Sequence, residues 1–237
     1  MTPVRLERRL AADAAGYYRP DGRAAYYSVR GKLGQDPAFA AILAHGLIAD
    51  GAQVLDLGCG RGLLPSWLRA AQIAYERDEW CVEWPPPPRA VRVRGVEQHA
   101  DSVARARRAL GEATVIELGD ILKADFTGAD TVVLLDVLHY IDRAAQDAVF
   151  ERIRAALPAD GVLILRVGDA AAGLPFRISR WVDQAVLLAR GDGWSGLHCR
   201  SLSEWHGALA EHGFRSQAVP IPRRAFSADV LLVARPQ

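Results

Sequence analysis

A short apolar strand that ends in an acid and runs into three alternating glycines constrains this chain more than any other feature. Residues 54–62 read VLDLGCGRG, and a helical pattern follows them. Glycine lets the backbone turn sharply and approach a ligand with no Cβ in the way. Amides at the start of the next helix can donate hydrogen bonds to a ligand, and Asp56 places a negative charge where a cationic group can sit. Turns of this kind are where open α/β sheets bind nucleotides.

The rest of the chain alternates apolar, strand-like runs with helical patterns, which is typical of a parallel sheet covered by helices. We expect Asp101 or Ser102 to cap one helix, and Ser201 or Ser203 to cap another that has Glu204 in its first turn. The expected strands cover residues 54–57, 91–96, 114–118, 131–136, 162–167, 215–221 and 230–234. The expected helices cover residues 39–49, 63–71, 101–110, 144–157 and 201–212.

The bulk composition narrows the class of protein. At 237 residues and 50% hydrophobic content, the chain can bury the core of one domain with elaborations. A net charge of +1 gives no field that favours nucleic acid. No run approaches the roughly 18 apolar residues of a membrane span, and the first residues lack an apolar signal-peptide core. Three cysteines far apart form neither a disulfide framework nor a metal knuckle. We expect a cytoplasmic protein without a metal site or membrane span.

Three segments fall outside the alternating pattern. Residues 1–37 contain four tyrosines among Gly and Pro, and we expect them to form a helical or irregular cap. Residues 75–90 are an insertion whose four consecutive prolines force an extended stretch, interpreted as a surface excursion with a partner-binding role as the alternative. Residues 170–200, with Phe176, Trp181 and Trp194, form a further elaboration.

The motifs of the chain resemble those of class I S-adenosylmethionine-dependent methyltransferases of the small-molecule type. DLGCGRG at residues 56–62 has the spacing G-x-G-x-G with a leading acid, unlike the dinucleotide fingerprint G-x-G-x-x-G. DVLHY at 136–140 is similar to the fourth motif of the family, and LPADGVL at 157–163 to its turn into the fifth strand. The resemblance covers residues 39–237 and departs from the family at residues 75–90.

The resemblance implies an α/β fold: a Rossmann-like, seven-stranded, mostly parallel sheet with helices on both faces and an antiparallel last strand. An N-terminal cap segment (residues 1–37) then precedes an S-adenosylmethionine-binding methyltransferase domain (residues 38–237) with insertions near 75–90 and 170–200. The cofactor it implies is S-adenosyl-L-methionine. The residues expected to bind it are Asp56, Gly58, Cys59, Gly60, Glu97, Gln98, Asp120, Ile121 and Asp136.

Strand-end acids supply a physical reason for several of these assignments. Glu97 ends the second strand, where a carboxylate can accept hydrogen bonds from both ribose hydroxyls. Asp120 can accept from the exocyclic amine of adenine while Ile121 offers the ring an apolar face, although Gly-Asp is also a common turn. The resemblance assigns Asp56 and the glycine turn to the methionine moiety and places Asp136 beside the cofactor.

His139 is the best candidate for a catalytic base, because it follows a strand end that faces the cofactor and histidine can take a proton near neutral pH. Packing or substrate orientation is the alternative. Asp169 and His198 are weaker candidates. The tyrosines of the first segment either line a substrate pocket or pack the cap. Arg30 and Lys32 either meet an anionic group or form a solvated helix face.

The absence of an Asn/Asp-Pro-Pro-Tyr/Phe or Pro-Cys motif after the fourth strand disfavours methylation of adenine, amide nitrogen or cytosine C5. We therefore expect methyl transfer to a small, partly apolar molecule at O or C. Residues 26–39 resemble the start of methyltransferases of fatty-acid-like or polyketide-like pigment pathways. A nicotinamide-dependent oxidoreductase and a non-catalytic cofactor-binding or partner protein are the alternatives. The expected partners are the methyl acceptor and a second copy in a homodimer, and no nucleic acid.

Overall fold

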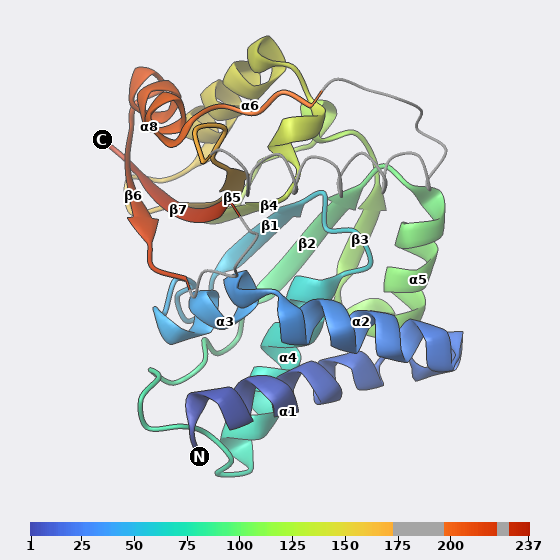
Figure 1. Cartoon of the computed structure of the whole chain (residues 1–237). Coiled ribbons are helices and arrows are strands. Elements are labelled where there is room, and N and C mark those ends of the chain that lie inside the picture. Colours follow the sequence, from blue (N-terminus) through green and yellow to red (C-terminus); the bar gives the residue numbers. More distant parts are fainter. Residues whose placement is uncertain (173–196, 222–227) are drawn as a thin grey trace. The chain divides into compact units, whose positions relative to one another are not determined.

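The computed structural model describes residues 1–172, 197–221 and 228–237, which group into two compact units, residues 1–132 and 133–237 (Figure 1). Most of the expected elaboration at residues 170–200, including Phe176, Trp181 and Trp194, lies outside the described residues. No helix in the described ranges is long and apolar enough to cross a membrane.

The first unit is built on three parallel strands: β1 (Gln53–Leu57), β2 (Arg92–Glu97) and β3 (Val115–Leu118). Their connections carry α4 (Leu63–Glu76) and α5 (Ala100–Leu110), and α3 (Pro37–Ala44) precedes β1. Parallel strands joined by helices place their carboxyl ends at one edge of the sheet. This edge is where the expected cofactor residues of the first unit lie.

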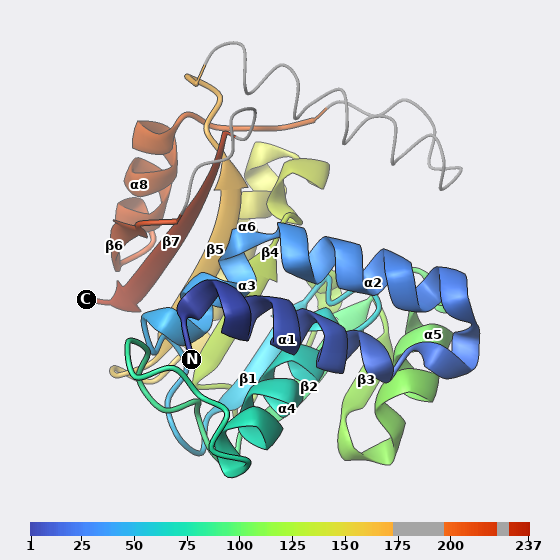
Figure 2. The ribbon, with the colours of Figure 1, turned by 60° about the horizontal axis from the view of Figure 1, so that its bottom comes forward.

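The expected N-terminal cap is helical. α1 (Pro3–Gly16) and α2 (Arg23–Gln35) are joined by the short 3-10 helix η1 (Arg19–Asp21). Figure 2 shows α1 lying along both α2 and α4, and the contacts between these elements agree with that view. Leu6 and Leu10 are fully buried on the inner side of α1. The two helices therefore belong to the core of the first unit.

The strand β4 (Thr131–Leu135) leads into the second unit, which contains β5 (Val162–Gly168), β6 (Phe214–Val219) and β7 (Asp229–Pro236). Its helices are α6 (Arg143–Ala156) and α8 (Leu202–Glu211). β7 runs antiparallel to both β5 and β6. The strand order is β3-β2-β1-β4-β5-β7-β6, so the predicted seven-stranded, mostly parallel sheet with an antiparallel last strand is confirmed.

The predicted element ends are right in some places and wrong in others. Ser201 caps α8 in a capping box with Glu204, as expected. The expected cap of α5 at Asp101 or Ser102 is wrong, because the helix already begins at Ala100 after the extended residue His99. The helix expected at residues 39–49 ends at residue 44, since Gly46 takes a left-handed conformation with φ of 56°.

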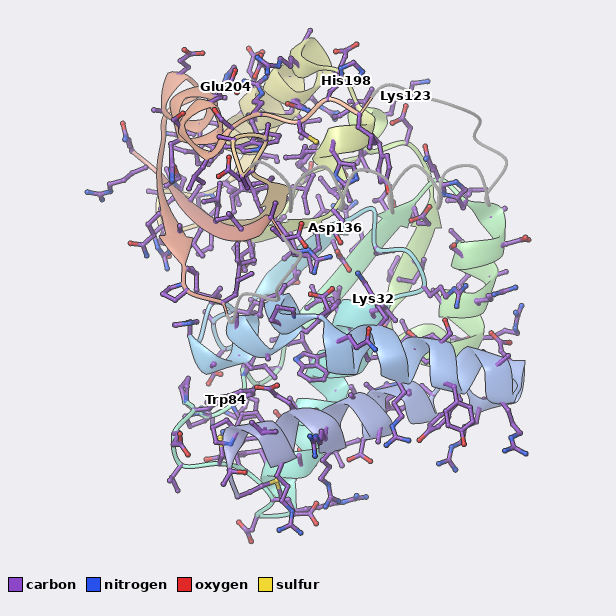
Figure 3. All side chains as sticks on the ribbon, in the orientation of Figure 1. Lys32, Trp84, Lys123, Asp136, His198 and Glu204 are labelled. Carbon is purple, nitrogen blue, oxygen red and sulfur yellow. The ribbon has the colours of Figure 1, made fainter. Side chains whose placement is uncertain are left out.

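The residues that follow α4 form an anchored loop. In this loop, the indole nitrogen of Trp80 donates a hydrogen bond to the carbonyl of Pro85 (3.0 Å). The ring of Trp80 packs edge-on against that of Trp84, which Figure 3 labels. Arg89 pairs with Asp50 through two nitrogens at 3.0 and 2.7 Å. The helix α4 continues to residue 76, so the excursion begins slightly later than expected. The excursion therefore folds on itself, and Arg89 ties its end to the residue Asp50 before β1, as a surface element of the first unit.

The middle and the last glycine of the turn at residues 58–62 differ in the space around them. An added Cβ on Gly62 (φ of 77°) lies 2.5 Å from Leu110 Cδ1, whereas one on Gly60 (φ of 57°) meets no atom within 4 Å. We expect Gly62→Ala to lower the free energy of unfolding by about 2–4 kcal/mol, through left-handed strain and overpacking. Gly60→Ala, the matched control, should cost about 1–2 kcal/mol. Urea unfolding measures both, and equal losses would contradict the packing role of Gly62.

Candidate cofactor site

Two acids lie at the carboxyl ends of adjacent strands in the first unit. Asp56 is the fourth residue of β1 and Glu97 is the last residue of β2. The strands pair in register, with Asp56 opposite Gly95 and Leu57 opposite Val96. Both carboxylates are buried, with residue exposures of 4% for Asp56 and 7% for Glu97. The structure therefore brings together the two acids expected to hold the methionine moiety and the ribose.

The glycine turn between β1 and α4 is held against the end of β2. Gly58, Gly60 and Gly62 all have positive φ, at 69°, 57° and 77°. The amides of Gly58 and Cys59 donate to the carbonyl of Val96 at 2.8 and 3.1 Å. The amide of Gly60 donates to Glu97 Oε2 at 3.0 Å, and that of Gly62 to the carbonyl of Cys59 at 2.9 Å.

These hydrogen bonds show which donors of the turn are already used. Its amides at residues 58, 59, 60 and 62 have protein partners, and the expectation that amides at the start of the next helix donate to a ligand stays a prediction. The turn also offers space, because no atom lies within 4 Å of the position that a Cβ on Gly60 would take. A ligand can approach the backbone there closely.

Cys59 contributes its backbone to the turn, and its sulfur lies 3.9 Å from the carbonyl oxygen of Gly60. Its side chain packs with Val103, Ala106, Leu110 and Ile116 in an apolar cluster under α5. A Cβ on Gly95 would lie 2.6 Å from its sulfur, so a glycine in β2 makes room for it. Burial is the main cause that raises the pKa of the Cys59 thiol far above its usual range. The thiol is therefore a small core group and not a nucleophile.

Glu97 is already hydrogen-bonded. Its Oε1 accepts from the amide of His99 at 2.9 Å and lies 2.6 Å from His99 Nδ1, while Oε2 accepts from Gly60. A carboxylate has about four acceptor positions, so roughly one remains on Oε2. Two hydrogen bonds from a ribose therefore require the ring of His99 to give up its contact with Glu97.

Asp56 has an unusual electrostatic state. Its carboxylate accepts no hydrogen bond from any residue that the structure describes. Burial, aided by the negative charge of Glu97, raises the pKa of Asp56 from 3.8 to about 7. A buried carboxylate without donors is costly unless a cation or a proton compensates it. A proton compensates Asp56 below about pH 7, and a cationic group is the other partner that this buried carboxylate can take.

The remaining expected residues of this unit lie at the surface after β2 and β3. Gln98 is exposed and follows Glu97 directly. Asp120 is exposed, and its side chain accepts from the amide of Leu122 at 2.9 Å to cap the short helix η3 (Ile121–Lys123). Ile121 is half-buried. Asp120 therefore has a structural role that the Gly-Asp turn predicted, and its second oxygen is left for other contacts.

Asp136 belongs to the second unit, where it follows β4 (labelled in Figure 3). It is one of three residues other than glycine with positive φ in the described part of the chain, at 60°. Its carboxylate pairs with the guanidinium of Arg166, a buried residue of β5, and its amide donates to the carbonyl of Arg166 at 3.3 Å. Left-handed residues of this kind gather at functional sites. The ion pair fixes where this carboxylate points.

His139 lies in the 3-10 helix η4 (Leu138–Tyr140) of the same unit and is 7% exposed. Burial lowers the pKa of His139 from 6.5 to about 4, although the negative charge of Asp229 acts in the opposite sense. The ring is therefore neutral at pH 7. The carbonyl of His139 accepts from the amide of His198 at 2.9 Å, so these two candidates are brought side by side, whereas Asp169 caps the backbone at Ala171 and Leu202.

A buried polar network that the sequence patterns did not reveal holds this segment. The side-chain amide of Gln146 is fully buried, and its nitrogen donates to three carbonyls, those of Leu138, Ile141 and His198. Its oxygen accepts from Arg200 Nε at 2.8 Å, and Arg200 also binds Asp147 at 2.7 Å. In the sequence, only the position of Gln146 within a predicted amphipathic helix could have indicated this network.

The basic residues of α2 lie on the surface. Lys32, labelled in Figure 3, pairs with Asp36 at 3.1 Å, and Arg30 is exposed. Tyr27 is 55% exposed and meets Tyr26 edge to face. Tyr17 lies against Arg69, whose guanidinium is 5.4 Å from the ring centroid. These residues fit a solvated helix face, and the anionic partner of Arg30 and Lys32 stays a prediction.

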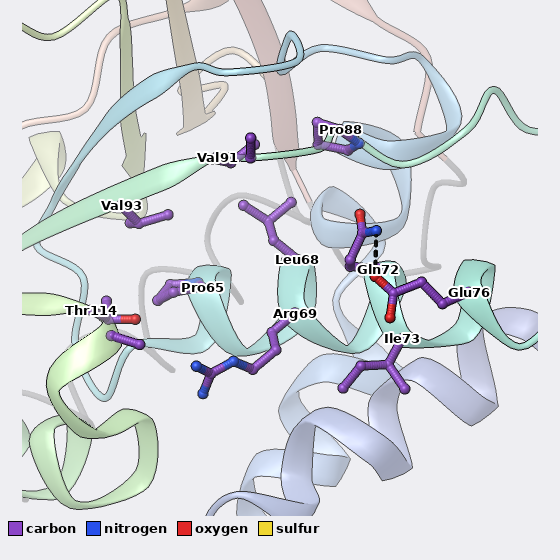
Figure 4. A pocket seen from close by; sticks show the side chains of 12 residues that line it. Pro65, Leu68, Arg69, Gln72, Ile73, Glu76, Pro88, Val91, Val93 and Thr114 are labelled. Atoms are coloured by element: carbon purple, nitrogen blue, oxygen red, sulfur yellow. Dashed lines mark hydrogen bonds between the residues drawn. The ribbon is translucent and has the colours of Figure 1, made fainter.

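A hollow of about 370 Å³ lies elsewhere in the first unit (Figure 4). Its walls come from α4 and from the start of β2, including Leu68, Gln72, Val91 and Val93. Glu97 lies at the other end of β2. This hollow is therefore separate from the edge that carries the two acids, and it takes no part in the site.

Comparison with known proteins places these features in a family. The sequence matches the methyltransferase domain family over residues 30–219. It is 36% identical over 141 residues to the carboxy-S-adenosyl-L-methionine synthase of Chromohalobacter salexigens. That match covers 54% of this chain and 47% of the relative, so the chain spans about half the length of the curated relative that it matches.

Solved structures share the fold. The pyocyanin biosynthetic protein PhzM is similar with a TM-score of 0.62 and 20% identity, over 95% of this chain and 62% of that chain. The mitomycin 7-O-methyltransferase MmcR has a TM-score of 0.61 and 21% identity, over 92% and 58%. The magnesium protoporphyrin IX methyltransferase of Synechocystis, solved with bound S-adenosylhomocysteine, has a TM-score of 0.57 and 21% identity, over 95% and 94%.

The raised pKa of Asp56 leads to a stability prediction. The folded state takes up the proton of Asp56 near pH 7 and the unfolded state near 3.8, so this group destabilises the ligand-free fold increasingly above pH 3.8 and fully above pH 7. We expect Asp56→Asn to raise the free energy of unfolding at pH 8, with a gain that shrinks toward pH 5. Each pKa unit corresponds to about 1.4 kcal/mol.

Urea unfolding between pH 5 and 8 measures this difference, and Asp101→Asn, an exposed acid on α5, is the control. A variant that is less stable than the wild type at pH 8 would show that Asp56 has compensating partners in the ligand-free protein.

Proposed function

Because the chain belongs to the class I S-adenosylmethionine-dependent methyltransferases, we propose that it transfers a methyl group from S-adenosylmethionine to a small, partly apolar molecule, at oxygen or carbon. The observation that carries this proposal is the pair of buried acids at the ends of β1 and β2, beside a turn of three left-handed glycines. None of the residues described by the structure donates a hydrogen bond to Asp56, and its raised pKa is compatible with a site that receives a cation.

The residues present fit the cofactor. Asp56 has the charge to hold the ammonium group of the methionine moiety, and the open backbone at Gly60 leaves room for it. Glu97 has one acceptor position left for a ribose hydroxyl and gains a second when His99 releases it. Asp120 and Ile121, with Gln98, stand at the neighbouring strand ends for the adenine. We place Asp136 beside the cofactor on the strength of the family pattern.

S-adenosylmethionine supplies an electrophilic methyl group on a sulfonium centre. The work of this chain is therefore to orient two partners and to exclude water. Asp56 and Glu97, both in the first unit, hold the methionine moiety and the ribose of the cofactor. His139, neutral at pH 7, has the protonation state to take a proton from a hydroxyl acceptor. An anionic or carbon acceptor needs no such base.

The small-molecule acceptor is supported by the kinds of protein that share the fold. Among them are proteins named for pyocyanin biosynthesis, mitomycin 7-O-methylation and magnesium protoporphyrin IX methylation. The near-zero net charge gives no general attraction for nucleic acid. A fatty-acid-like or polyketide-like pathway, a cytoplasmic location, a homodimer and the division into residues 1–37 and 38–237 complete the proposal.

Thermal shift separates this function from the oxidoreductase alternative. S-adenosylhomocysteine should raise the Tm and NAD should not, because a ligand that binds only the folded state stabilises it. Release of S-adenosylhomocysteine in the presence of a panel of phenolic, carboxylic and enolic acceptors then tests turnover. Stabilisation by NAD alone would overturn the proposal, and binding without turnover would favour the non-catalytic alternative.

A second candidate is formation of a carboxylated cofactor, favoured by the 36% identity to a carboxy-S-adenosyl-L-methionine synthase. The two candidates differ in the molecule that the protein holds after purification. Mass spectrometry of the released ligand distinguishes S-adenosylmethionine from its carboxy derivative, in which a carboxyl group replaces one hydrogen. Recovery of the carboxy form would favour the second candidate.

We expect Glu97→Gln to weaken binding of S-adenosylhomocysteine at least tenfold, because hydrogen bonds to a charged group are worth about 1.5–3 kcal/mol each. The amide also repels the donor amide of His99, since its nitrogen cannot accept. Titration calorimetry at pH 8 measures the Kd. Glu117→Gln, on the neighbouring strand β3, is the control. Unchanged binding by a folded Glu97→Gln protein would remove the ribose assignment.

His139→Ala should lower turnover by about 10² to 10⁴ with a hydroxyl acceptor, the usual contribution of a positioned base. The Kd of the cofactor should hardly change. Burial moves the acid limb of the pH–rate profile from the ordinary histidine range to near pH 4, the pKa of His139. His198→Ala tests the weaker candidate, an exposed residue in contact with the same segment, and a loss of turnover there in place of His139→Ala would favour His198 as the base. Normal turnover of His139→Ala would assign the residue to packing.

A further inference from the structure

The N-terminal helices contribute one buried hydroxyl to the glycine turn. Tyr18, between α1 and η1, is 1% exposed. Its hydroxyl lies 2.8 Å from the carbonyl oxygen of Arg61 and 3.0 Å from that of Gly62, and one O–H donates to both. From this geometry we infer that Tyr18 is a positioning residue of the cofactor site, acting by fixing the glycine turn. This inference rests on the proposed function, and residue 18 lies outside the matched range of 30–219.

The second half of the glycine turn, at Arg61 and Gly62, has few other restraints. The end of β2 fixes its first half, through the amides of Gly58, Cys59 and Gly60. In the second half, the carbonyl of Gly62 accepts from the amide of Ser66 at 3.3 Å, a long bond for the first turn of α4. Glycine has more backbone freedom to lose than any other residue. Tyr18 supplies the restraint on the half of the turn that β2 does not reach.

Tyr18 is itself fixed in place. Its amide donates to the carbonyl of Ala15 at 3.0 Å, and its carbonyl accepts from the amide of Asp21 at 3.2 Å. Asp21 in turn pairs with Arg108 of α5 at 2.8 Å, which docks η1 onto that helix. Burial is the main cause that raises the pKa of the Tyr18 hydroxyl, so it stays a donor at every physiological pH.

A restraint on the turn affects cofactor affinity through the fraction of molecules that hold the competent conformation. The apparent Kd is the intrinsic Kd divided by that fraction. Without the hydroxyl, the carbonyls of Arg61 and Gly62 lose the buried donor that links them to Tyr18, and we expect the turn to sample other conformations. Linkage also works in reverse, so a cofactor that stabilises the turn must stabilise the segment around Tyr18.

The test compares Tyr18→Phe with Tyr17→Phe. Tyr17 is the adjacent residue, and its hydroxyl makes no hydrogen bond to any residue in the described ranges. We expect Tyr18→Phe to raise the Kd for S-adenosylhomocysteine about 3- to 10-fold, the effect of one net hydrogen bond. Tyr17→Phe should change it less than about 2-fold. The KM for S-adenosylmethionine should rise with the Kd, and kcat should stay within a factor of about two.

Hydrogen exchange gives a second readout. In the ligand-free protein, amides of residues 57–64 should exchange faster in Tyr18→Phe than in the wild type, while Tyr17→Phe should match the wild type. In the wild type, S-adenosylhomocysteine should slow exchange at residues 15–22, which decides the matter if Tyr18→Phe does not fold. Unchanged Kd and unchanged exchange in Tyr18→Phe, or no slowing at residues 15–22 in the liganded wild type, would overturn the inference.

The experiments distinguish a failure of the proposed function from a failure of the role inferred for Tyr18. A wild type that does not bind S-adenosylhomocysteine would overturn the proposed function, and the ligand-free exchange at residues 57–64 would still test whether Tyr18 fixes the turn. A wild type that binds it normally, with Tyr18→Phe binding equally well, would leave the proposed function intact and remove Tyr18 from the site.

Discussion

The hydrogen bonds between the glycine turn and the end of β2 are the interaction on which the first unit depends. The amides of Gly58 and Cys59 share the carbonyl of Val96, and the amide of Gly60 reaches the carboxylate of Glu97. This arrangement ties the ends of two adjacent strands together and directs the side chain of Cys59 into the core. It also starts α4 at a fixed place beside α5, where Gly62 leaves room for Leu110. The same contacts thus serve the packing of the unit and the shape of the site.

The two buried acids at this edge, Asp56 and Glu97, differ in their hydrogen-bond partners. Glu97 is compensated by the amides of Gly60 and His99 and by the ring of His99. Asp56 receives no hydrogen bond from the described residues and responds by holding its proton up to about pH 7. An unpaired buried carboxylate lowers stability, and proteins keep such groups where a ligand completes them. A cationic ligand bound at this site would therefore relieve its electrostatic cost.

Local sequence signals predicted the parts of the molecule that depend on local chemistry. The strand, acid and glycine pattern around Asp56 and the capping box at Ser201 appear in the structure as predicted, since each rests on residues close in sequence. The cap of α5 was wrong because several polar residues in a row fit the same rule, and the extended backbone at His99 decided the start. The sequence predicted helical or irregular structure for residues 1–37, but it did not indicate that α1 packs along α2 and α4.

Long-range partners could not be predicted, because nothing in the sequence pairs them. The room for Cys59 comes from Gly95, 36 residues further along the chain (95 − 59), and the partner of the amides of Gly58 and Cys59 is the carbonyl of Val96 on another strand. Tyr18 was one of several tyrosines with no feature to single it out, yet its hydroxyl meets residues 61 and 62. Such contacts depend on how helices dock, which periodicity alone does not specify.

In the second unit, a buried polar network holds the candidate catalytic segment in addition to the apolar packing of Leu138. Gln146 donates to the carbonyl of Leu138 at the start of η4, to that of Ile141 just after it and to that of His198, so it links the two segments. Buried networks of this kind are favourable only when every member is paired, which makes them specific. The backbone of His139 is therefore held through its neighbours and through the contact with His198. Removing the imidazole leaves these backbone bonds intact, so a loss of turnover in His139→Ala can be assigned to the ring.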